Sequence, residues 1–414
     1  MLNKNDKKNI IWNTIGTTIN AFSSLLFMII VTRINGISDA GIYTYGFSIA
    51  CLFNVIGIYS GRIYQVTDNT EITDNDYFVN KLITCLIMFL VTIVFLIFNN
   101  YSIWKTSIIF SLCILKTFEA FEEVLYAFLQ KDNYLYKVGI SLTIKTLFGL
   151  ISFLLIDIFT NNILFSSISV ILINLLVAFC YDLKNVNKNL LSIKKINWKN
   201  IFLIFKRGFL SFLLTFMIMY IINIPRYIID AKMDSEFSTI FGIIIMPATF
   251  MVLISQFILH PFLLKLKNYI KIGNKQKIKN LIIKMNLFIL IIGIFILIIV
   301  YFLGIPVLEF IYNIKLTDYK TSLLIVIAGS IMYGMVTLLS NVLVSMRVLF
   351  SQVIIYIIVT IVSLFASNVL IVSSGVEGGC ISYSITMILM LIGFIITTIY
   401  SVIKIKGVKK IAKS

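Results

Sequence analysis

Charged residues are scarce in this chain: Asp, Glu, Lys and Arg together make up 13% of its 414 residues, against about 25% in soluble globular domains. This scarcity argues against a water-soluble enzyme or binding domain. There are only five cysteines and one histidine. The cysteines lie singly inside apolar stretches without CxxC spacing, whereas disulfide frameworks and zinc sites need paired or clustered ligands. The sequence therefore predicts no metal site and no cofactor.

The chain also lacks any hydrophilic stretch longer than about 25 residues between its apolar segments. A soluble catalytic or nucleotide-binding domain has no room in so short a stretch. The sequence contains no Walker A loop, no HExxH and no GxSxG, so neither ATP-driven nor hydrolytic chemistry is indicated. We therefore expect that the protein is not an enzyme.

What the sequence has in abundance is apolar side chains, which make up 59% of it and give a mean hydropathy of +1.00. They occur in runs of about 20 residues, the length that a helix needs to cross about 30 Å of hydrocarbon. We predict an all-α polytopic membrane protein with about 12 transmembrane helices, at 10–32, 40–61, 79–98, 104–129, 138–159, 162–182, 208–229, 239–262, 284–305, 321–345, 350–373 and 379–402.

The distribution of lysine and arginine predicts the orientation, because segments rich in these residues stay in the cytoplasm. With the N-terminus inside, 27 of the 35 Lys and Arg residues fall in inner segments and 5 in outer ones. We therefore predict that both termini are cytoplasmic. This distribution also accounts for the net charge of +17 without a nucleic-acid partner, and the basic run 265–284 is expected to lie against anionic lipid.

The basic segment 184–207 is the best candidate for a boundary between domains. It would separate an N-terminal six-helix lobe, 1–183, from a C-terminal six-helix lobe, 208–403. A basic cytoplasmic tail, 404–414, would follow.

The fourth predicted span carries more charge than the others. A charge at mid-bilayer costs at least about 2.5 kcal/mol, so such residues must face a partner or water. Helical spacing places Glu119 and Glu123 within about 60° of Lys116, and Glu122 or Glu123 lies at the same predicted depth as Lys145 in the fifth span. Two interpretations stay open: a buried ion pair that fixes the register of two helices, or the wall of a polar cavity that faces a substrate.

Two arginines, Arg33 and Arg226, lie at the predicted outer ends of the first and seventh spans, against the positive-inside trend. They are either interfacial side chains that extend toward water or phosphate-binding groups, a role that suits the planar guanidinium. The first span also carries a polar stripe on one face, which suits either close helix packing or the lining of a lumen. The stripe consists of Asn13, Thr17, Asn20 and Ser24.

Four local strings resemble Wzx-type polysaccharide flippases, members of the multidrug/oligosaccharidyl-lipid/polysaccharide exporter superfamily. The first string, Val31-Thr-Arg-Ile-Asn-Gly-Ile-Ser-Asp-Ala-Gly-Ile-Tyr43, is similar to the end of the first span in that family. The others are Ser60-Gly-Arg-Ile-Tyr-Gln-Val66, Asn223-Ile-Pro-Arg-Tyr-Ile-Ile-Asp230 and Phe241-Gly-Ile-Ile-Ile-Met-Pro247. With the span count and loop lengths, the resemblance covers nearly the whole chain.

The resemblance implies two six-helix lobes around a central, partly cationic cavity, and alternating access. The implied substrate is an undecaprenyl-diphosphate-linked oligosaccharide, moved from the inner to the outer leaflet of a bacterial plasma membrane for capsule, O-antigen or other surface polysaccharide synthesis. Arg33 and Arg226 match family positions. Implied partners are membrane lipid, a polysaccharide polymerase with its export machinery, and a coupling ion, proton or sodium.

Two other functions stay open. The first is a cation-coupled drug or metabolite antiporter of the same superfamily, which would use an acidic intramembrane site such as Glu119, Glu122 or Glu123. The second is a membrane polysaccharide polymerase, which we would expect to carry a large outer loop. The longest predicted outer loop, about 306–320, holds only Glu309 and Asp318 as acidic residues.

Overall fold

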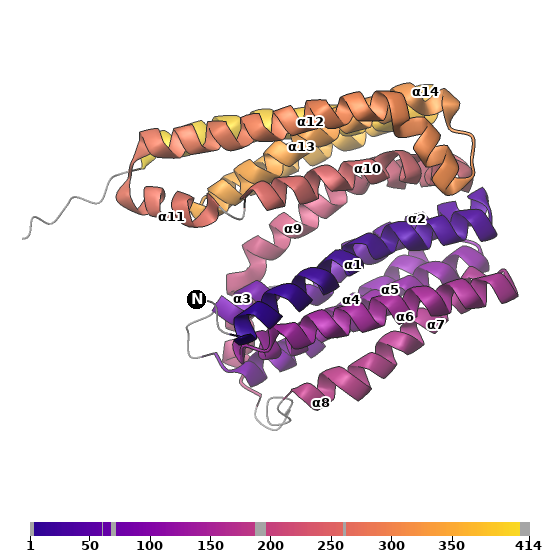
Figure 1. Ribbon diagram of the computed structural model, residues 1–414, viewed down its shortest axis with the longest axis horizontal. Helices are drawn as coiled ribbons and strands as arrows, with labels where there is room; N and C mark the ends of the chain where they lie inside the picture. Colours follow the sequence, from indigo (N-terminus) through magenta and orange to yellow (C-terminus); the bar gives the residue numbers. More distant parts are fainter. Residues whose placement is uncertain (1–3, 60, 68–71, 187–195, 260–261, 406–414) are drawn as a thin grey trace, which may run out of the picture. The chain divides into compact units, whose positions relative to one another are not determined.

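The structure, a computed structural model, describes residues 4–59, 61–67, 72–186, 196–259 and 262–405. These ranges are helical almost throughout and contain no strand. Figure 1 shows the helices in order. They are α1 Lys4–Ile34, α2 Ile37–Ile58, α3 Gly61–Thr67, α4 Asp74–Phe98, α5 Ile103–Lys131, α6 Leu135–Thr160, α7 Ile163–Val177, α8 Leu183–Asn185, α9 Trp198–Lys232, α10 Ser235–Leu259, α11 Leu263–Ile272, α12 Lys275–Tyr312, α13 Lys320–Ser345 and α14 Phe350–Lys404.

Ten of these helices are long and apolar enough to cross a membrane. Two further spans bring the total to the predicted twelve. One is α5, which is 29 residues long but carries more charge, and the other arises because α14, one of the ten, is two helices joined at Gly375. Gly375 has φ of 56° and ψ of −131°, a conformation that is open to glycine but costly for other residues. The prediction of an all-α, multi-pass membrane protein is confirmed.

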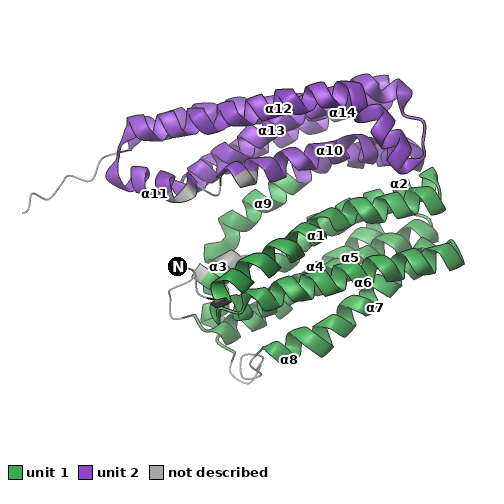
Figure 2. Ribbon diagram, viewed as in Figure 1, with its two compact units in different colours: residues 1–219 green, residues 220–414 purple. Residues whose placement is uncertain are grey.

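The chain divides into two compact units, Met1–Met219 and Tyr220–Ser414, and α9 belongs to both (Figure 2). This division falls inside α9, later than the predicted linker 184–207, of which residues 187–195 lie outside the described residues. The two predicted lobes and the orientation of the termini stay predictions.

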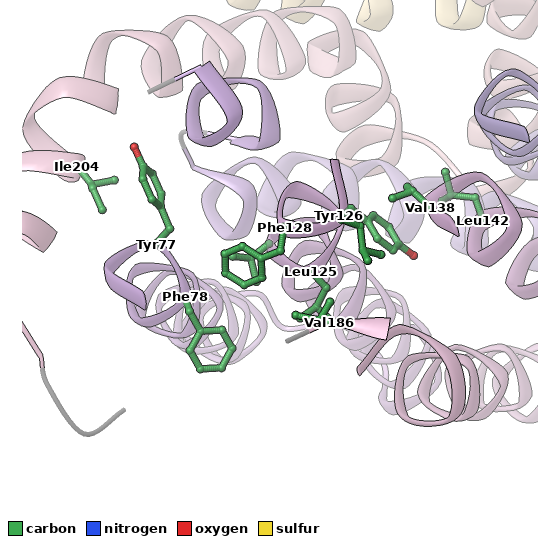
Figure 3. Packing of buried hydrophobic residues seen from close by; sticks show 11 residues of the cluster. Tyr77, Phe78, Leu125, Tyr126, Phe128, Val138, Leu142, Val186 and Ile204 are labelled. Atoms are coloured by element: carbon green, nitrogen blue, oxygen red, sulfur yellow. The ribbon is translucent and has the colours of Figure 1, made fainter. Parts of the chain in front are cut away.

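In unit 1, α5 occupies a central position because it packs against α2, α4, α6 and α7, while α1 packs along α6. Apolar side chains, mainly of α4, α5 and α6, form a buried cluster near the C-terminal end of α5. Figure 3 shows Tyr126 extending from α5 toward Val138 and Leu142 of α6. Tyr126 therefore joins this apolar cluster to the polar groups described below.

The second span ends earlier than the sequence predicts. The prediction placed 40–61 in one helix, but α2 ends at Ile58, where Tyr59 adopts φ of 46°, and the separate helix α3 follows. Lys81, which the orientation argument counts among the 27 inner Lys and Arg residues, is buried in α4 at 6% exposure. Its ammonium donates to the carbonyls of Gly57 and Ile58 at 3.0 and 2.6 Å, so it satisfies the last carbonyls of α2.

Helices α1 and α6 pack closely because both carry glycine at their contact. A Cβ at Gly139 would lie 2.1 Å from the carbonyl oxygen of Trp12, and a Cβ at Gly16 would lie 2.3 Å from that of Gly139. Small residues allow this approach between membrane helices, where packing replaces the hydrophobic effect as the source of stability.

We expect Gly139→Ala to destabilise unit 1 by about 1–3 kcal/mol, because the added methyl group forces the two backbones apart. A lower melting temperature of the purified protein in detergent would show this. The matched control is Gly149→Ala on the same helix, where the nearest atom to the new Cβ is 3.4 Å away. Equal melting temperatures for the two variants would contradict the expectation.

In unit 2, α13 packs against α10, α12 and α14. Pro247 lies inside α10, as predicted for the eighth span, and Pro306 lies inside α12. The predicted outer loop 306–320 is therefore shorter than expected, since α12 continues to Tyr312. The basic run 265–284 forms α11 and the first turns of α12, which meet at Gly273.

Candidate functional site

The centre of unit 1 holds an ion pair between Glu122 of α5 and Lys145 of α6. Their side chains are 1% and 6% exposed, so both charges are almost completely removed from solvent. Of the two glutamates that the sequence left open for this pair, the structure selects Glu122. A buried pair of this kind requires further hydrogen bonds to offset the loss of hydration.

A chain of hydroxyl groups supplies such contacts. The Tyr126 hydroxyl donates to Glu122 Oε2 at 3.3 Å and lies 3.0 Å from the Ser141 hydroxyl. The Ser141 hydroxyl in turn lies 3.0 Å from Asp182 Oδ2, within hydrogen-bond distance. Asp182 is fully buried and ends a π-helical segment, Ala178–Asp182, that interrupts the chain after α7. Segments of this kind occur often at functional sites.

On the other side of the ion pair, unit 1 contains a small polar cavity with a volume of about 30 Å³. This exceeds the roughly 10–15 Å³ that one water molecule needs. Lys116 donates to Glu119 Oε2 at 2.7 Å and lies 5.0 Å from the centre of the Phe47 ring. The cavity is lined by Asn20, Ser23, Phe27, Tyr43, Phe47, Leu115, Lys116, Glu119, Lys145, Thr146, Val170 and Asn174.

Three of the predicted site residues, Lys116, Glu119 and Lys145, are thus brought together in one cavity, with Asn20 from the polar stripe of the first span. The Thr146 hydroxyl donates to Asn20 Oδ1 at 3.3 Å, which connects α1 to α6 at the cavity wall. The cavity therefore draws side chains from five helices, α1, α2, α5, α6 and α7.

Glu123 does not belong to this group. Its carboxylate lies 3.8 Å from Nε of Arg62 in α3, and both residues line a separate cavity of about 10 Å³ with Lys81. The helical spacing of α5 alone places Glu123 with Lys116, but α3 packs against α5 and brings Arg62 to Glu123. Lys116 and Glu119 therefore line one cavity and Glu123 lines another, although helical spacing places all three on one side of α5.

The two arginines lie in different units. Arg33 is exposed in the last turn of α1, in unit 1. Arg226 is half-buried in α9, in unit 2, and its Nη1 donates to Asn223 Oδ1 at 3.4 Å. Pro225 precedes it inside the helix.

Unit 2 contains larger hollows, but they are apolar. One, of about 560 Å³, lies between α12, α13 and the second half of α14, and Lys279 and Asn286 are among its few polar lining residues. Such a surface suits hydrocarbon chains and offers little to a charged group. The charged cavity of unit 1 is therefore the better candidate for polar chemistry.

The charges of the cavity and ion pair balance, with two lysines against Glu119 and Glu122. Lys116, Lys145 and Glu119 line the cavity and Glu122 does not, so an anion in the cavity meets two lysines and a cation meets one carboxylate. Among the described residues, no group of three or more His, Cys, Asp or Glu side chains is placed to hold a metal ion.

Two buried groups were missed by the sequence reasoning, Asp182 and Lys81. Asp182 is the last residue of the predicted sixth span, and a charged residue at that position is expected at the membrane surface. The spacing of charged residues along the sequence gives no signal that would have placed Asp182 in the interior.

The sequence was compared with protein-family models and with curated proteins. No family model matches the chain. The capsular polysaccharide biosynthesis protein CapF of Staphylococcus aureus is 26% identical over 348 residues, which cover 78% of this chain and 83% of CapF.

Solved structures are similar over nearly the whole length. An inward-facing multidrug resistance MATE family transporter of the MOP superfamily gives a TM-score of 0.69 at 12% identity, covering 95% of this chain and 98% of the transporter. The lipid II flippase MurJ in an inward closed conformation gives 0.67 at 15% identity, covering 95% and 90%. The eukaryotic MATE transporter AtDTX14 gives 0.67 at 11% identity, covering 96% of each chain. The chain has the fold that MATE transporters share with MurJ.

Proposed function

We propose that the protein is a flippase that moves undecaprenyl-diphosphate-linked oligosaccharide repeat units from the inner to the outer leaflet of the bacterial plasma membrane, by alternating access of two six-helix lobes. Its product would supply capsule or other surface polysaccharide synthesis. The observation that carries the proposal is the charged cavity of unit 1, where Lys116 and Lys145 lie among membrane-spanning helices. Two lysines within the membrane provide attraction for a diphosphate.

The comparisons support the same direction. MurJ, which shares the fold, is a lipid II flippase, and CapF takes part in capsular polysaccharide biosynthesis. A diphosphate and a sugar chain need a polar, hydrated path, whereas a polyprenyl tail is soluble in the bilayer. In this proposal the small polar cavity of unit 1 widens into such a path during alternating access, and the apolar bundle around it leaves the tail in lipid.

In this proposal Lys116 and Lys145 receive the diphosphate, and Glu119 holds Lys116 in place until the substrate arrives. Arg33 and Arg226 bind phosphate oxygens or sugar hydroxyls through the paired donors of the guanidinium group. Glu123 contributes indirectly, because its ion pair with Arg62 holds α3 in position.

The test uses purified protein in liposomes that contain a polyprenyl-diphosphate oligosaccharide with a labelled sugar. We expect protein-dependent movement of the label to the far leaflet, measured by its exposure to an impermeant reagent. Arg33→Ala and Arg226→Ala are expected to lower the rate about 10- to 100-fold, the loss of a charged hydrogen bond. Lys315→Ala, which removes a cation from the connection after α12, is the matched control.

The proposal would be contradicted if the label moved at the same rate in liposomes with and without the protein, or if both arginine variants kept full activity. An Arg33→Lys variant separates charge from geometry, since lysine keeps the charge but loses the paired donors. Equal rates for the Lys and Ala variants would assign the loss to the guanidinium geometry.

A second candidate is a cation-coupled drug or metabolite antiporter, because multidrug transporters share the fold and Glu119 lines the cavity. This candidate predicts ion-gradient-dependent export of a lipophilic cation from loaded liposomes. Absence of such export, with movement of the lipid-linked sugar, would exclude it.

A further inference from the structure

Three oxygen–oxygen contacts connect two buried carboxyl groups of unit 1 in the order Asp182, Ser141, Tyr126, Glu122. The distances along this buried hydroxyl chain are 3.0, 3.0 and 3.3 Å. Asp182 and Ser141 are 0% exposed, and Tyr126 and Glu122 are 1% exposed. Bulk water therefore does not reach the oxygen atoms that form these contacts.

The number of protons decides whether all three contacts can be hydrogen bonds. An ionised carboxylate only accepts, and each hydroxyl donates one proton. With both carboxyl groups ionised, Ser141 and Tyr126 supply two protons for three contacts, so one pair of oxygens faces without a proton. With one proton on Asp182, its O–H donates to Ser141, Ser141 donates to Tyr126, and Tyr126 donates to Glu122. A proton on Glu122 in place of Asp182 would also satisfy the three contacts, with every donor reversed. Glu122 is the carboxylate that binds Lys145, which favours its ionised form and places the proton on Asp182.

The charges around Asp182 lead to the same result. The titratable groups that face it are Glu122 and Tyr126 of α5 and Lys145 of α6, with Tyr181 next to it in its own segment. Lys145 is the one cation among them and already binds Glu122. A second ionised carboxylate would leave a net negative charge buried between membrane helices, at a cost of several kcal/mol.

The remaining carboxyl oxygens have no compensating donor. Asp182 Oδ1 and Glu122 Oε1 are buried and have no hydrogen-bond partner among the described residues. An ionised Asp182 would thus have one donor, from Ser141, for two charged oxygens, whereas buried carboxylates usually accept several hydrogen bonds.

We infer that Asp182 is a proton-binding site, and that the buried hydroxyl chain connects its proton to the Glu122–Lys145 ion pair. When Asp182 is protonated, the chain is directed toward Glu122, which then accepts from both Tyr126 and Lys145. When Asp182 loses its proton, Ser141 donates to Asp182 and Tyr126 donates to Glu122. The Ser141 and Tyr126 oxygens then face each other without a proton between them, and the hydrogen-bonded connection between the two carboxyl groups is broken. Since Lys145 also lines the polar cavity, proton binding at Asp182 changes the electrostatic environment of that cavity.

Infrared spectroscopy of the full-length protein in detergent tests the inference without any transport substrate, so it does not depend on the proposed function. A protonated carboxyl group has a C=O stretching band separate from the bands of amides and carboxylates. We expect the difference spectrum between the unmodified protein and Asp182→Asn, at neutral pH, to show the loss of one such band. The band is expected to disappear from the unmodified protein at alkaline pH.

Asp182→Asn is expected to fold, because its amide donates to Ser141 as the protonated acid does. The control is Asp132→Asn at the exposed end of α5, which is expected to leave the band unchanged. Ser141→Ala gives a second readout: it removes the acceptor of the Asp182 proton and is expected to shift the band to higher wavenumber. The inference is overturned if Asp182→Asn removes no band, or if Ser141→Ala leaves every carboxyl band in place.

Discussion

Replacing Lys145 with methionine is expected to destabilise the protein by about 3–5 kcal/mol, because Glu122 would be left charged and unpaired in the interior of unit 1. The methionine fills most of the lysine volume, so the loss is electrostatic. Glu122→Gln has the opposite effect on charge, since it leaves Lys145 without its carboxylate. The measurement is the melting temperature of each variant in detergent, compared with that of the unmodified protein.

The double variant Glu122→Gln/Lys145→Met distinguishes the cost of an unpaired charge from the contribution of the pair. Replacing a buried pair by neutral side chains of similar volume is often nearly neutral. We therefore expect the double variant to recover most of the stability that Lys145→Met loses, a coupling that a double-mutant cycle measures directly.

The matched control is Lys131→Met at the end of α5, the helix that carries Glu122. Lys131 pairs with Asp74 at 2.5 Å, but these side chains are 26% and 28% exposed, and partly exposed pairs contribute about 1 kcal/mol or less. If Lys145→Met and Lys131→Met lower the melting temperature equally, the ion pair is not buried in the way that the structure shows.

Most of the helices could be predicted from the sequence because a membrane span is a linear property. About 20 apolar residues in succession are sufficient to indicate a helix across the bilayer, and each of the twelve predicted spans corresponds to a helix or to half of α14. The errors occur where backbone conformation decides. Positive φ at Tyr59 and Gly61 ends α2 and begins α3, and no hydropathy pattern encodes this.

The candidate site was predictable only in part. Helical spacing and equal depth indicate that a glutamate of the fourth span meets Lys145, but Glu122 and Glu123 differ by one position, or 100° around the helix. The choice between them depends on the neighbours of α5. Because α6 faces Glu122 and α3 brings Arg62 to Glu123, each glutamate has its own cation, which is a tertiary property.

Asp182 illustrates a second limit. At the end of a predicted span, an aspartate is normally expected at the membrane surface. Its burial arises because the π-helical segment and the contact with Ser141 turn it inward. A buried hydroxyl chain combines residues 122, 126, 141 and 182 from three segments, and the spacing of these residues along the sequence carries no sign of it.

The two candidate functions make opposite predictions for Glu119, and this is the sharpest test of the cavity. Glu119 accepts from Lys116 at 2.7 Å. If the cavity binds a diphosphate, Glu119 competes with the substrate for Lys116. Glu119→Gln is then expected to keep transport of the lipid-linked sugar and to raise its apparent affinity. If the cavity binds a coupling cation, the same change removes a ligand and is expected to abolish ion-dependent export.

Lys116→Gln completes the comparison. We expect it to reduce flipping of the lipid-linked sugar about 10- to 100-fold, because the substrate loses a charged hydrogen bond. Glutamine nearly retains the side-chain volume and helix propensity of lysine. The matched variant Lys105→Gln, in the first turn of α5, is expected to keep its activity. The rate of label movement in liposomes measures each variant. Loss of activity in Glu119→Gln with full activity in Lys116→Gln would reject the anion-binding role and assign the cavity to a cation, because only the carboxylate would then be required.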